Sequence, residues 1–443
     1  MFILTEDGKL VRAPRPRISL QDALNQGYTV EQIRAIYGLP ANFDGAGMVI
    51  AVLEYGSGYN QSDLDGFCDG MGIPRFTPTL ISVDGGQNDG GTQPGDLEGT
   101  LDLEWVHAMA PGAKIVVFYA PNPPDWTGFA QEVVDSLIAV QHYSQTVEHV
   151  DAITGSYGDA EENFPKALMQ QANADAKAMK PSGTITGFSS GDQGDYGTHQ
   201  YGLPPIKRSD WPATCPDILG FGGTKIPQLA PLIEQLWDES GFGATGGTYS
   251  EDFPRPPYQN GVHQNPGRGV CDLSLLADPF TGYKAFFMGQ WQVVGGTSVS
   301  CPVGIGLLVC LMQARKLRGL PPITDMHTFL YSHPEAFRDI EEGNNGLNGT
   351  PGEPCVKGWD PPTGLGAPRG DVLLTLFTTE EEVVPVTQPT KIPVFVDGKE
   401  QPFDALLQDG YAYCPIVDTA KALGFTATRD LKGVYITTAP KAP

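Results

Sequence analysis

One serine stands in a sequence setting that suits nucleophilic chemistry. The segment Gly295-Gly-Thr-Ser-Val-Ser-Cys-Pro302 precedes the apolar run Val303–Met312, which predicts a buried helix that begins at or near Ser298. Backbone N–H groups and the positive end of such a helix would stabilise an oxyanion beside the hydroxyl. The alternative is an ordinary N-cap serine or threonine after a glycine turn, and the motif alone does not decide between them.

Two acidic residues are spaced to lie on one face of a helix. Glu98 and Asp102 are four residues apart in the segment Gly95–Ala113, so a helix there would let their side chains touch. Like charges at this spacing are mildly unfavourable, and a solvated acidic face is the simpler interpretation of this segment alone. A proton shared by the two carboxyls would instead make a coupled pair, with one pKa lowered and the other raised.

A third acid, Asp192, follows a predicted buried strand within the glycine-bounded segment Gly187–Gly194. An aspartate flanked by glycines is commonly the residue that forms the turn. Taken alone, this segment therefore favours a structural aspartate.

The seven histidines do not supply an obvious general base. Ser298 stands in a G-T-S-x-x-x-P pattern that resembles the one of subtilisin-like enzymes, in which the serine needs a histidine. None of the histidines here shows a strand-end Asp/His pattern, and a surface or structural role is expected for most of them: His107, His142, His149, His199, His263, His327 and His333.

The elements that must position these residues alternate between strands and helices. Buried strands are predicted at Met48–Leu53, Lys114–Tyr119, Val150–Thr154, Thr184–Ser189 and Asp217–Phe221, with helices at Gln131–Gln141 and Pro165–Met179. This β-α-β order predicts a doubly wound α/β fold, a parallel sheet with helices on both faces. Its ligand site is expected at the carboxyl ends of the strands.

Composition excludes several classes of partner. A formal net charge of −24 and a pI near 4.5 disfavour nucleic acid and anionic membranes, and they suit a protein that works in acid. The longest apolar run, Val303–Met312, is about ten residues and too short for a membrane span, which needs about 20. Seven cysteines without a CxxC pair indicate buried thiols and not a disulfide framework or a zinc site, and the first 20 residues lack a signal-peptide core.

The pattern changes near residue 379. An acidic, proline-bearing linker is predicted over 379–392, after which 393–443 form a small α+β domain with strands at Val394–Val396, Tyr411–Cys414 and Val434–Thr437 and a helix at Pro415–Leu423. Residues Pro393–Lys399 and Ala412–Gly424 resemble the small domain named after the copper amine oxidase N-terminus. Because no His/Cys cluster occurs there, we expect a stalk or surface attachment module and not a copper site.

Several blocks between residues 28 and 378 resemble the sedolisin (serine-carboxyl peptidase) family in their sequence and in their order along the chain. They are Tyr28–Pro40, Val49–Glu54, Trp211–Pro216, Gly222–Thr224, Ala244–Ser250, Phe253–Pro254, Tyr258–Gln259 and Ala277–Tyr283, together with the segments around Glu98, Asp192 and Ser298. The resemblance implies a subtilisin-like fold for residues 28–378, preceded by an extension of residues 1–27. It also implies an acid-active serine endopeptidase that cleaves proteins or peptides.

The resemblance further implies a role for each candidate residue. Ser298 would be the nucleophile, Glu98 the general base, Asp102 its orienting partner and Asp192 a protonated donor to the oxyanion. A carboxylate base still accepts a proton in acid, where a histidine of pKa about 6.5 is already charged. A protonated aspartate donates a hydrogen bond that an ionised one cannot.

Outside these four residues, the resemblance assigns Glu54 and Tyr157 to a supporting hydrogen-bond network in which relatives often have tryptophan at the Tyr157 position. It also implies a structural Ca²⁺ near the end of the large domain. The expected ligands are the carboxylates of Asp339 and Asp360 and the backbone carbonyls of Ile340, Val356 and Gly358, all hard oxygen donors. An acidic surface loop is the alternative.

Two further hypotheses concern location and class. Only 27 residues precede Tyr28, where the family has a prodomain, so we expect a processed form or a member without one, located outside the cell or attached to a surface. The main alternative is a non-catalytic surface or virion protein that keeps the peptidase fold, with attachment through 393–443. A histidine-dependent subtilisin-like peptidase, most active near neutral or alkaline pH, is the second alternative.

Overall fold

A computed structural model describes residues 27–196, 207–239, 242–347 and 349–379, together with the backbone of strands near both ends of the chain. The chain divides into two compact units, Met1–Thr378 and Thr379–Pro443, and each is described by itself. The first unit carries all four candidate catalytic residues.

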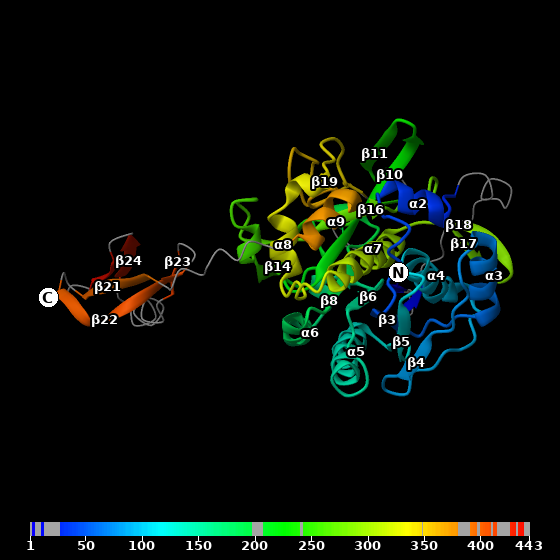
Figure 1. Ribbon diagram of the computed structural model, residues 1–443, viewed down its shortest axis with the longest axis horizontal. Helices are drawn as coiled ribbons and strands as arrows, with labels where there is room; N and C mark the ends of the chain where they lie inside the picture. Colours follow the sequence, from blue (N-terminus) through cyan, green and yellow to red (C-terminus); the bar gives the residue numbers. More distant parts are fainter. Residues whose placement is uncertain are drawn as a thin grey trace. The chain divides into compact units, whose positions relative to one another are not determined.

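The first unit is built on an eight-stranded, mainly parallel sheet (Figure 1). The strand order is β11-β10-β8-β6-β3-β5-β4, and β16 also pairs with β10. Only the β10–β11 pair in this sheet is antiparallel. The strands are β3 (Val49–Tyr55), β4 (Thr79–Ser82), β5 (Lys114–Ala120), β6 (Ala152–Gly155), β8 (Ile185–Ser189), β10 (Leu219–Leu229), β11 (Leu232–Leu236) and β16 (Leu273–Leu276). The five predicted strands therefore correspond to β3, β5, β6, β8 and β10.

Helices cover both faces of this sheet. Alternate residues of strand β3 point to opposite faces, and both sets are apolar, so each face needs a covering layer. Ile50 and Val52 of β3 belong to the core shared with α4 (Leu97–Met109) and α7 (Thr297–Leu317). Ala51 and Leu53 belong to the core shared with α5 (Trp126–Thr146) and α6 (Lys166–Met179). The predicted doubly wound α/β fold is confirmed for this unit.

Helix α7 is the core helix that was predicted from its apolar run, but it is 21 residues long. By length and composition it would suffice to cross a membrane, yet 94% of its most apolar window is buried inside the protein. Among the described residues it is the single helix that passes this test. Its apolar character is therefore explained by packing against α4 and the sheet.

Smaller elements frame this body. The remaining helices are α2 (Val30–Ile36), α3 (Gln61–Met71), α8 (Met326–Tyr331) and α9 (Gly370–Thr378). Hairpin β17–β18 (Tyr283–Phe287 and Gln290–Val294) leads directly into α7. Short paired strands are β1–β2 (Phe2–Leu4, Leu10–Arg12), β7–β9 (Asp159–Ala160, Asp210–Trp211), β12–β13 (Asp238–Glu239, Gly243–Ala244), β14–β15 (Tyr249–Pro254, Gly267–Gly269) and β19–β20 (Phe337–Arg338, Ala367–Pro368).

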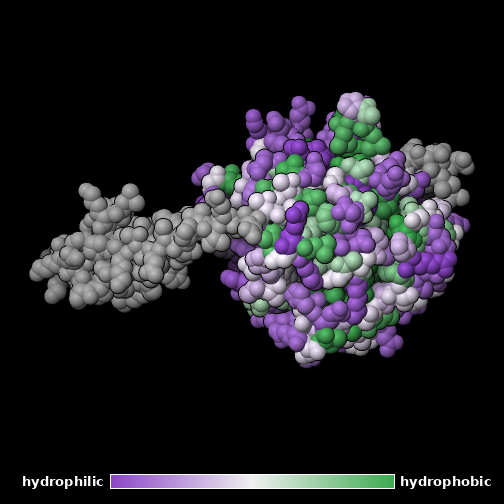
Figure 2. All heavy atoms as spheres, in the orientation of Figure 1, coloured by the Kyte–Doolittle hydropathy of each residue, from purple (hydrophilic) through white to green (hydrophobic). Residues whose placement is uncertain are grey.

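The surface of this unit carries a small apolar area, and its cysteines lie inside. On the face in Figure 2, polar and apolar residues are interspersed, with apolar atoms gathered on the hairpin of β10 and β11. Leu229 and Ile233 of that hairpin are 42% and 39% exposed. Six cysteines among the described residues are buried and free, as expected from their spacing.

The second unit contains a five-stranded sheet in the order β23-β22-β21-β25-β24. Its strands are β21 (Thr390–Val396), β22 (Lys399–Gln408), β23 (Tyr411–Tyr413), β24 (Thr426–Asp430) and β25 (Gly433–Thr437), with β21 and β25 parallel. The three predicted strands fall on β21, β23 and β25, whereas β22 and β24 were not predicted. The predicted helix Pro415–Leu423 and residues 380–389 of the predicted linker lie outside the described residues.

Candidate active site

Ser298 is the second residue of α7 and is only 3% exposed. The turn before it depends on glycine, since Gly296 has a φ of +99°. A Cβ at that position would also approach Asp192 Oδ2 to 2.6 Å. The predicted helix start at the serine is therefore correct, and the glycine allows the Asp192 carboxyl to lie against the turn that holds Ser298.

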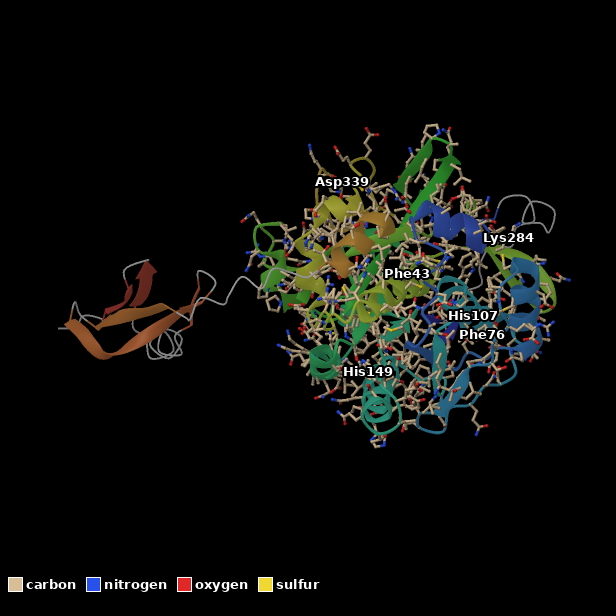
Figure 3. All side chains as sticks on the ribbon, in the orientation of Figure 1. Phe43, Phe76, His107, His149, Lys284 and Asp339 are labelled. Atoms are coloured by element: carbon tan, nitrogen blue, oxygen red, sulfur yellow. The ribbon has the colours of Figure 1, made fainter. Side chains whose placement is uncertain are left out.

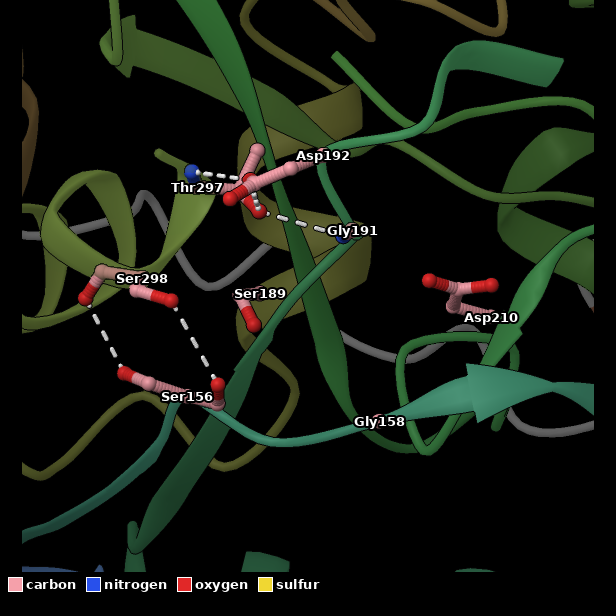
Figure 4. A pocket seen from close by; sticks show the side chains of 8 residues that line it. All are labelled: Ser156, Gly158, Ser189, Gly191, Asp192, Asp210, Thr297 and Ser298. Atoms are coloured by element: carbon pink, nitrogen blue, oxygen red, sulfur yellow. Dashed lines mark hydrogen bonds between the residues drawn. The ribbon is translucent and has the colours of Figure 1, made fainter. Parts of the chain in front are cut away.

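Asp192 follows β8 and is fixed by the residue next to the serine. Its Oδ1 accepts hydrogen bonds from the backbone N–H of Thr297 at 2.7 Å and from the Thr297 hydroxyl at 2.8 Å. The same hydroxyl accepts the N–H of Gly191 at 3.1 Å (Figure 4). Because Oδ1 is occupied by two donors, Oδ2 is the oxygen available for a proton or a ligand. The interpretation of Asp192 as a simple turn former is thus incomplete.

Glu98 and Asp102 both lie on α4, as their spacing predicted, but the expected solvated acidic face is wrong. Glu98 is 3% exposed and Asp102 is fully buried. The cause is packing, because every residue of α4 from Glu98 to Met109 is buried against neighbouring elements. A carboxyl so placed loses hydration, which favours its protonated form unless hydrogen bonds or cations compensate.

Ser156, which follows β6, connects the α4 carboxyls to the serine. Its Oγ lies 2.9 Å from Asp102 Oδ1 and 3.0 Å from the carbonyl oxygen of Ser298. In return, the Ser298 hydroxyl donates to the carbonyl of Ser156 over 3.5 Å (Figure 4). The structure thus joins Ser298 and Asp102 through one intervening side chain.

Glu54 and Tyr157 form a second buried connection next to α4. The Tyr157 hydroxyl donates to Glu54 Oε2 at 2.5 Å, and both side chains are fully buried. A Cβ on Gly99 would come within 3.1 Å of the same Glu54 oxygen, so this pair lies against α4 beside Glu98. The predicted pairing of Glu54 with Tyr157 is therefore present in this chain with a phenol as the donor.

A pocket opens where these elements meet, at the carboxyl ends of β6 and β8. It is lined by Ser156, Gly158, Ser189, Gly191, Asp192, Asp210, Thr297 and Ser298. Sequence reasoning missed Ser156, Ser189, Asp210 and Thr297 as pocket residues, although Asp210 directly precedes the recognisable block Trp211–Pro216. Asp210 is 2% exposed, and it adds a carboxyl that favours a cation or a hydrogen-bond donor on a bound molecule.

Histidine does not take part in this pocket among the described residues. His107, His142, His149, His263, His327 and His333 are all absent from its lining, and His199 lies outside the described part of the chain. His107, although on α4, stacks on Phe76 with ring centroids 3.9 Å apart (Figure 3). Burial lowers its pKa to about 4, so it is a neutral core residue above that pH.

The five expected calcium ligands come from two neighbouring loops. Asp339 Oδ2 accepts the N–H of Gly358 at 2.7 Å, and Asp360 Oδ2 accepts the N–H of Val356 at 3.0 Å. Burial raises the pKa of Asp360 to about 7, and the negative charge of the nearby Asp339 carboxyl acts in the same direction. Among the described residues, no group of three or more His, Cys, Asp or Glu side chains could hold a metal, so backbone carbonyls would have to supply the other ligands.

Comparison with known proteins relates this arrangement to a family. No protein-family model matches the chain. Kumamolisin from Bacillus sp. (strain MN-32) is 34% identical over 372 residues, which cover 80% of this chain and 64% of the relative. Sedolisin from Pseudomonas sp. (strain 101) is 28% identical over 359 residues, which cover 77% of this chain and 60% of the relative. The chain therefore spans less than two thirds of the length of these curated relatives.

A solved structure agrees with this result. Pseudomonas sedolisin, described as a serine-carboxyl proteinase in complex with two molecules of pseudo-iodotyrostatin, is similar with a TM-score of 0.68 and 26% identity. The match covers 79% of this chain and 98% of that chain. The first unit is therefore a subtilisin-like α/β domain. More specifically, its sequence and fold are similar to those of the sedolisin-family peptidases kumamolisin and sedolisin.

Proposed function

We propose that this chain is an acid-active serine endopeptidase that hydrolyses peptide bonds in proteins or peptides. Its nucleophile is Ser298, its general base is Glu98, Asp102 orients that base, and Asp192 donates to the oxyanion. The observation that carries the proposal is the convergence of a serine at a helix N-terminus, a carboxyl fixed beside it and two buried carboxyls on one neighbouring helix. The similarity to kumamolisin and sedolisin supports the same reaction class.

The reaction begins with attack of Ser298 Oγ on the carbonyl carbon of the scissile peptide. Glu98 takes the hydroxyl proton and later gives it to the leaving amine, so an acyl-serine forms as the C–N bond breaks. Water then attacks the acyl carbon and gives a proton to Glu98. As the bond between the acyl carbon and Ser298 Oγ breaks, Glu98 passes that proton to Oγ, which releases the carboxyl product and restores both Ser298 and Glu98. A carboxyl suits this role in acid because its ordinary pKa is near 4.3, whereas histidine is charged below about pH 6.5.

The contacts of Asp192 support its proposed role as the oxyanion donor. Two donors from Thr297 occupy its Oδ1, so Oδ2, on the side of Gly296, is the oxygen that would carry the donated proton. The N-terminus of α7 adds positive potential at the same place. A hydrogen bond aimed at the developing oxyanion acts mainly in the transition state, so its loss lowers kcat.

This role makes a prediction that separates two variants. Asp192→Asn keeps the shape and provides an N–H donor at any pH, whereas Asp192→Ala removes the donor and should cost about 10²- to 10³-fold in kcat. We expect the asparagine variant to retain more activity than the alanine variant, with its alkaline limb shifted upward. The measurement is kcat/KM on a short unstructured peptide from pH 3 to 8. An asparagine variant as inactive as the alanine one, with an unshifted limb, would assign the pH dependence to Glu98 and Asp102.

A structural Ca²⁺ is proposed for the loops that contain Asp339 and Asp360. The donors present fit a hard cation, since the carboxyls of Asp339 and Asp360 act on each other and the backbone carbonyls of Ile340, Val356 and Gly358 are oxygens. Two nearby carboxyls in a partly buried site repel each other, and a divalent cation would offset that repulsion. When bound, the ion would tie the two loops together.

Removal of this ion should lower the stability of the folded protein. An ion that binds the native state alone adds RT ln(1 + [L]/Kd), or about 2.7 kcal/mol at 100 times its Kd. We therefore expect a chelator to lower Tm for the wild type, and Asp360→Asn to make Tm insensitive to the chelator. Acid should weaken binding, because the pKa of Asp360 is raised to about 7 and its protonation removes a charged ligand. An unchanged Tm in chelator, with no metal found by elemental analysis, would contradict the site.

Location and the second unit complete the proposal. The first unit is proposed to act outside the cell or at a surface, with residues 393–443 as an attachment module similar to the copper amine oxidase N-terminal domain. The boundaries 1–27, 28–378, 379–392 and 393–443 are proposed as the extension, catalytic domain, linker and module. No nucleic acid partner and no membrane span are proposed, and the acidic charge supports the absence of a nucleic acid partner.

One experiment separates the three classes of function. The wild-type chain is incubated with an unfolded protein substrate from pH 3 to 8, and fragments are counted by mass spectrometry. The proposal predicts cleavage that is fastest in acid. A non-catalytic surface or virion protein predicts no fragments at any pH, and a histidine-dependent peptidase predicts cleavage near neutral or alkaline pH.

A further inference from the structure

The proline that follows the nucleophile creates an unmet requirement in α7. In an α-helix the carbonyl of each residue accepts the N–H of the residue four positions later. The carbonyl of Ser298 faces position 302, where Pro302 has no N–H to donate. Both residues are buried, so this carbonyl needs a donor other than bulk water.

The hydroxyl of Ser156 supplies that donor from a different element. It lies 3.0 Å from the Ser298 carbonyl oxygen, and Ser156 is 3% exposed. Ser156 follows β6, and β6 packs against α7, so the two positions are held by the central sheet. The same oxygen lies 2.9 Å from Asp102 Oδ1 on α4. One hydroxyl therefore contacts both the turn that carries the nucleophile and a member of the proposed triad.

We propose that Ser156 is a positioning residue, whose hydroxyl fixes the Ser298 turn in place of the N–H that Pro302 lacks and couples this turn to Asp102. The proposal rests on the proposed function, because it assumes that Ser298 is the nucleophile. It concerns how Ser298 is held in place and not the chemical step, since Ser156 neither forms nor breaks a bond to the substrate. Its effect is to keep Ser298 Oγ in line with the substrate carbonyl, where small displacements strongly reduce the rate.

The number of hydrogens at Ser156 links this role to acid. A hydroxyl has one hydrogen, so it can donate to Ser298 or to Asp102 but not to both. When Asp102 is protonated, it donates to Ser156 Oγ, and Ser156 is free to donate to the Ser298 carbonyl. When Asp102 is ionised, the charged oxygen is the stronger acceptor and draws the hydrogen away from Ser298.

Several titratable groups act on Asp102 in this arrangement. Glu98 lies one turn earlier on α4, Cys301 approaches from α7, and Glu54 lies over Gly99 of the same helix. Negative charge on Glu98 or Glu54 favours the protonated form of Asp102, whereas Cys301 stays neutral because burial raises its thiol pKa. The charge on these acidic neighbours therefore acts on the proton that Asp102 holds.

The test compares two buried serines near the nucleophile, Ser156 after β6 and Ser300 on α7. Ser156→Ala should lower kcat at least about 10-fold with little change in KM, because an unsatisfied buried carbonyl disturbs the turn. Ser300→Ala is the matched control, since the Ser300 hydroxyl donates at 2.6 Å to the carbonyl of Gly222 and is also fully buried. It should lose stability while keeping kcat. Ser156→Cys keeps the volume with a weaker donor and should show a smaller loss than Ser156→Ala.

Pro302→Ala provides the decisive rescue, because it returns an N–H to the position that should serve the Ser298 carbonyl. In the Ser156→Ala background it should raise kcat about fivefold or more. Separately, the loss of kcat in Ser156→Ala relative to wild type should become smaller from pH 3 to pH 6, because ionised Asp102 already draws the Ser156 hydrogen away from Ser298. A Ser156→Ala kcat within threefold of wild type, or a loss that Pro302→Ala does not reverse, overturns the positioning role. A loss that is constant with pH overturns the link to Asp102. Turnover by Ser298→Ala would instead overturn the proposed function itself.

Discussion

Ser298→Ala should abolish peptide hydrolysis while leaving the fold intact. Loss of the serine from a triad typically costs about 10⁶-fold in kcat, because the covalent route disappears. The fold should persist, since among the described residues the Ser298 hydroxyl makes one hydrogen bond, the 3.5 Å contact with the carbonyl of Ser156. The measurements are kcat on a short peptide and thermal unfolding of the same preparation.

The control for this result is Ser300→Ala, prepared in the same way. Its hydroxyl lies two residues further along α7 and makes structural hydrogen bonds to Gly222 and Leu275. It should retain kcat, so any contaminating peptidase would be recognised by equal activity in both variants. Turnover by purified Ser298→Ala above that background would refute the nucleophile.

Glu98→Gln and Asp102→Asn should each lower kcat by at least about 10²-fold, the usual weight of general base catalysis. Both substitutions keep the size of the side chain. Glu98→Gln removes the group that takes the proton from Ser298, and Asp102→Asn removes the carboxyl that stabilises that proton on Glu98. The change should appear in kcat more than in KM, because neither residue lines the pocket. The measurement is a steady-state kinetic comparison at the most favourable acidic pH.

Glu104→Gln is the matched control for these acids. Glu104 is on the same helix and is fully buried, and both of its oxygens accept the backbone N–H of Phe286 at 3.2 Å. Burial raises its pKa well above the ordinary value, so the neutral amide mimics its state in acid. It should keep kcat within a few fold. Equal losses for Glu104→Gln, Glu98→Gln and Asp102→Asn would indicate a general effect of disturbing α4.

The sheet could be predicted from sequence because its strands are short, apolar and separated by helical patterns. The same local reasoning failed for α4, where the spacing of Glu98 and Asp102 was correct but their burial was not. Binary patterning assumes that an acidic helix face meets water, and α4 is enclosed on all sides. The decisive fact was tertiary, namely the packing of α4 against α7 and its other neighbours.

The pocket could be predicted only in part, for a similar reason. Ser298 and Asp192 stand in glycine-rich segments that mark unusual backbone, which a sequence displays directly. Ser156 and Asp210 stand in ordinary contexts. Ser156 reaches the pocket because it follows β6 at the carboxyl edge of the parallel sheet, and Asp210 reaches it from the separate antiparallel pair β7–β9. The same limit applies to the second unit, whose strands β22 and β24 lack an apolar alternation strong enough to be recognised.

The central claim is that a carboxyl base, and not a histidine, activates Ser298. It is tested most directly by kcat/KM of the wild-type chain on a short unstructured peptide from pH 3 to 8, where substrate unfolding cannot contribute. The account predicts full activity near pH 4, where a histidine of ordinary pKa would be charged. It also predicts a decline toward neutral pH, because the proposed oxyanion donor must be a protonated carboxyl. Activity that is lost below about pH 6 and greatest near neutral pH would contradict it.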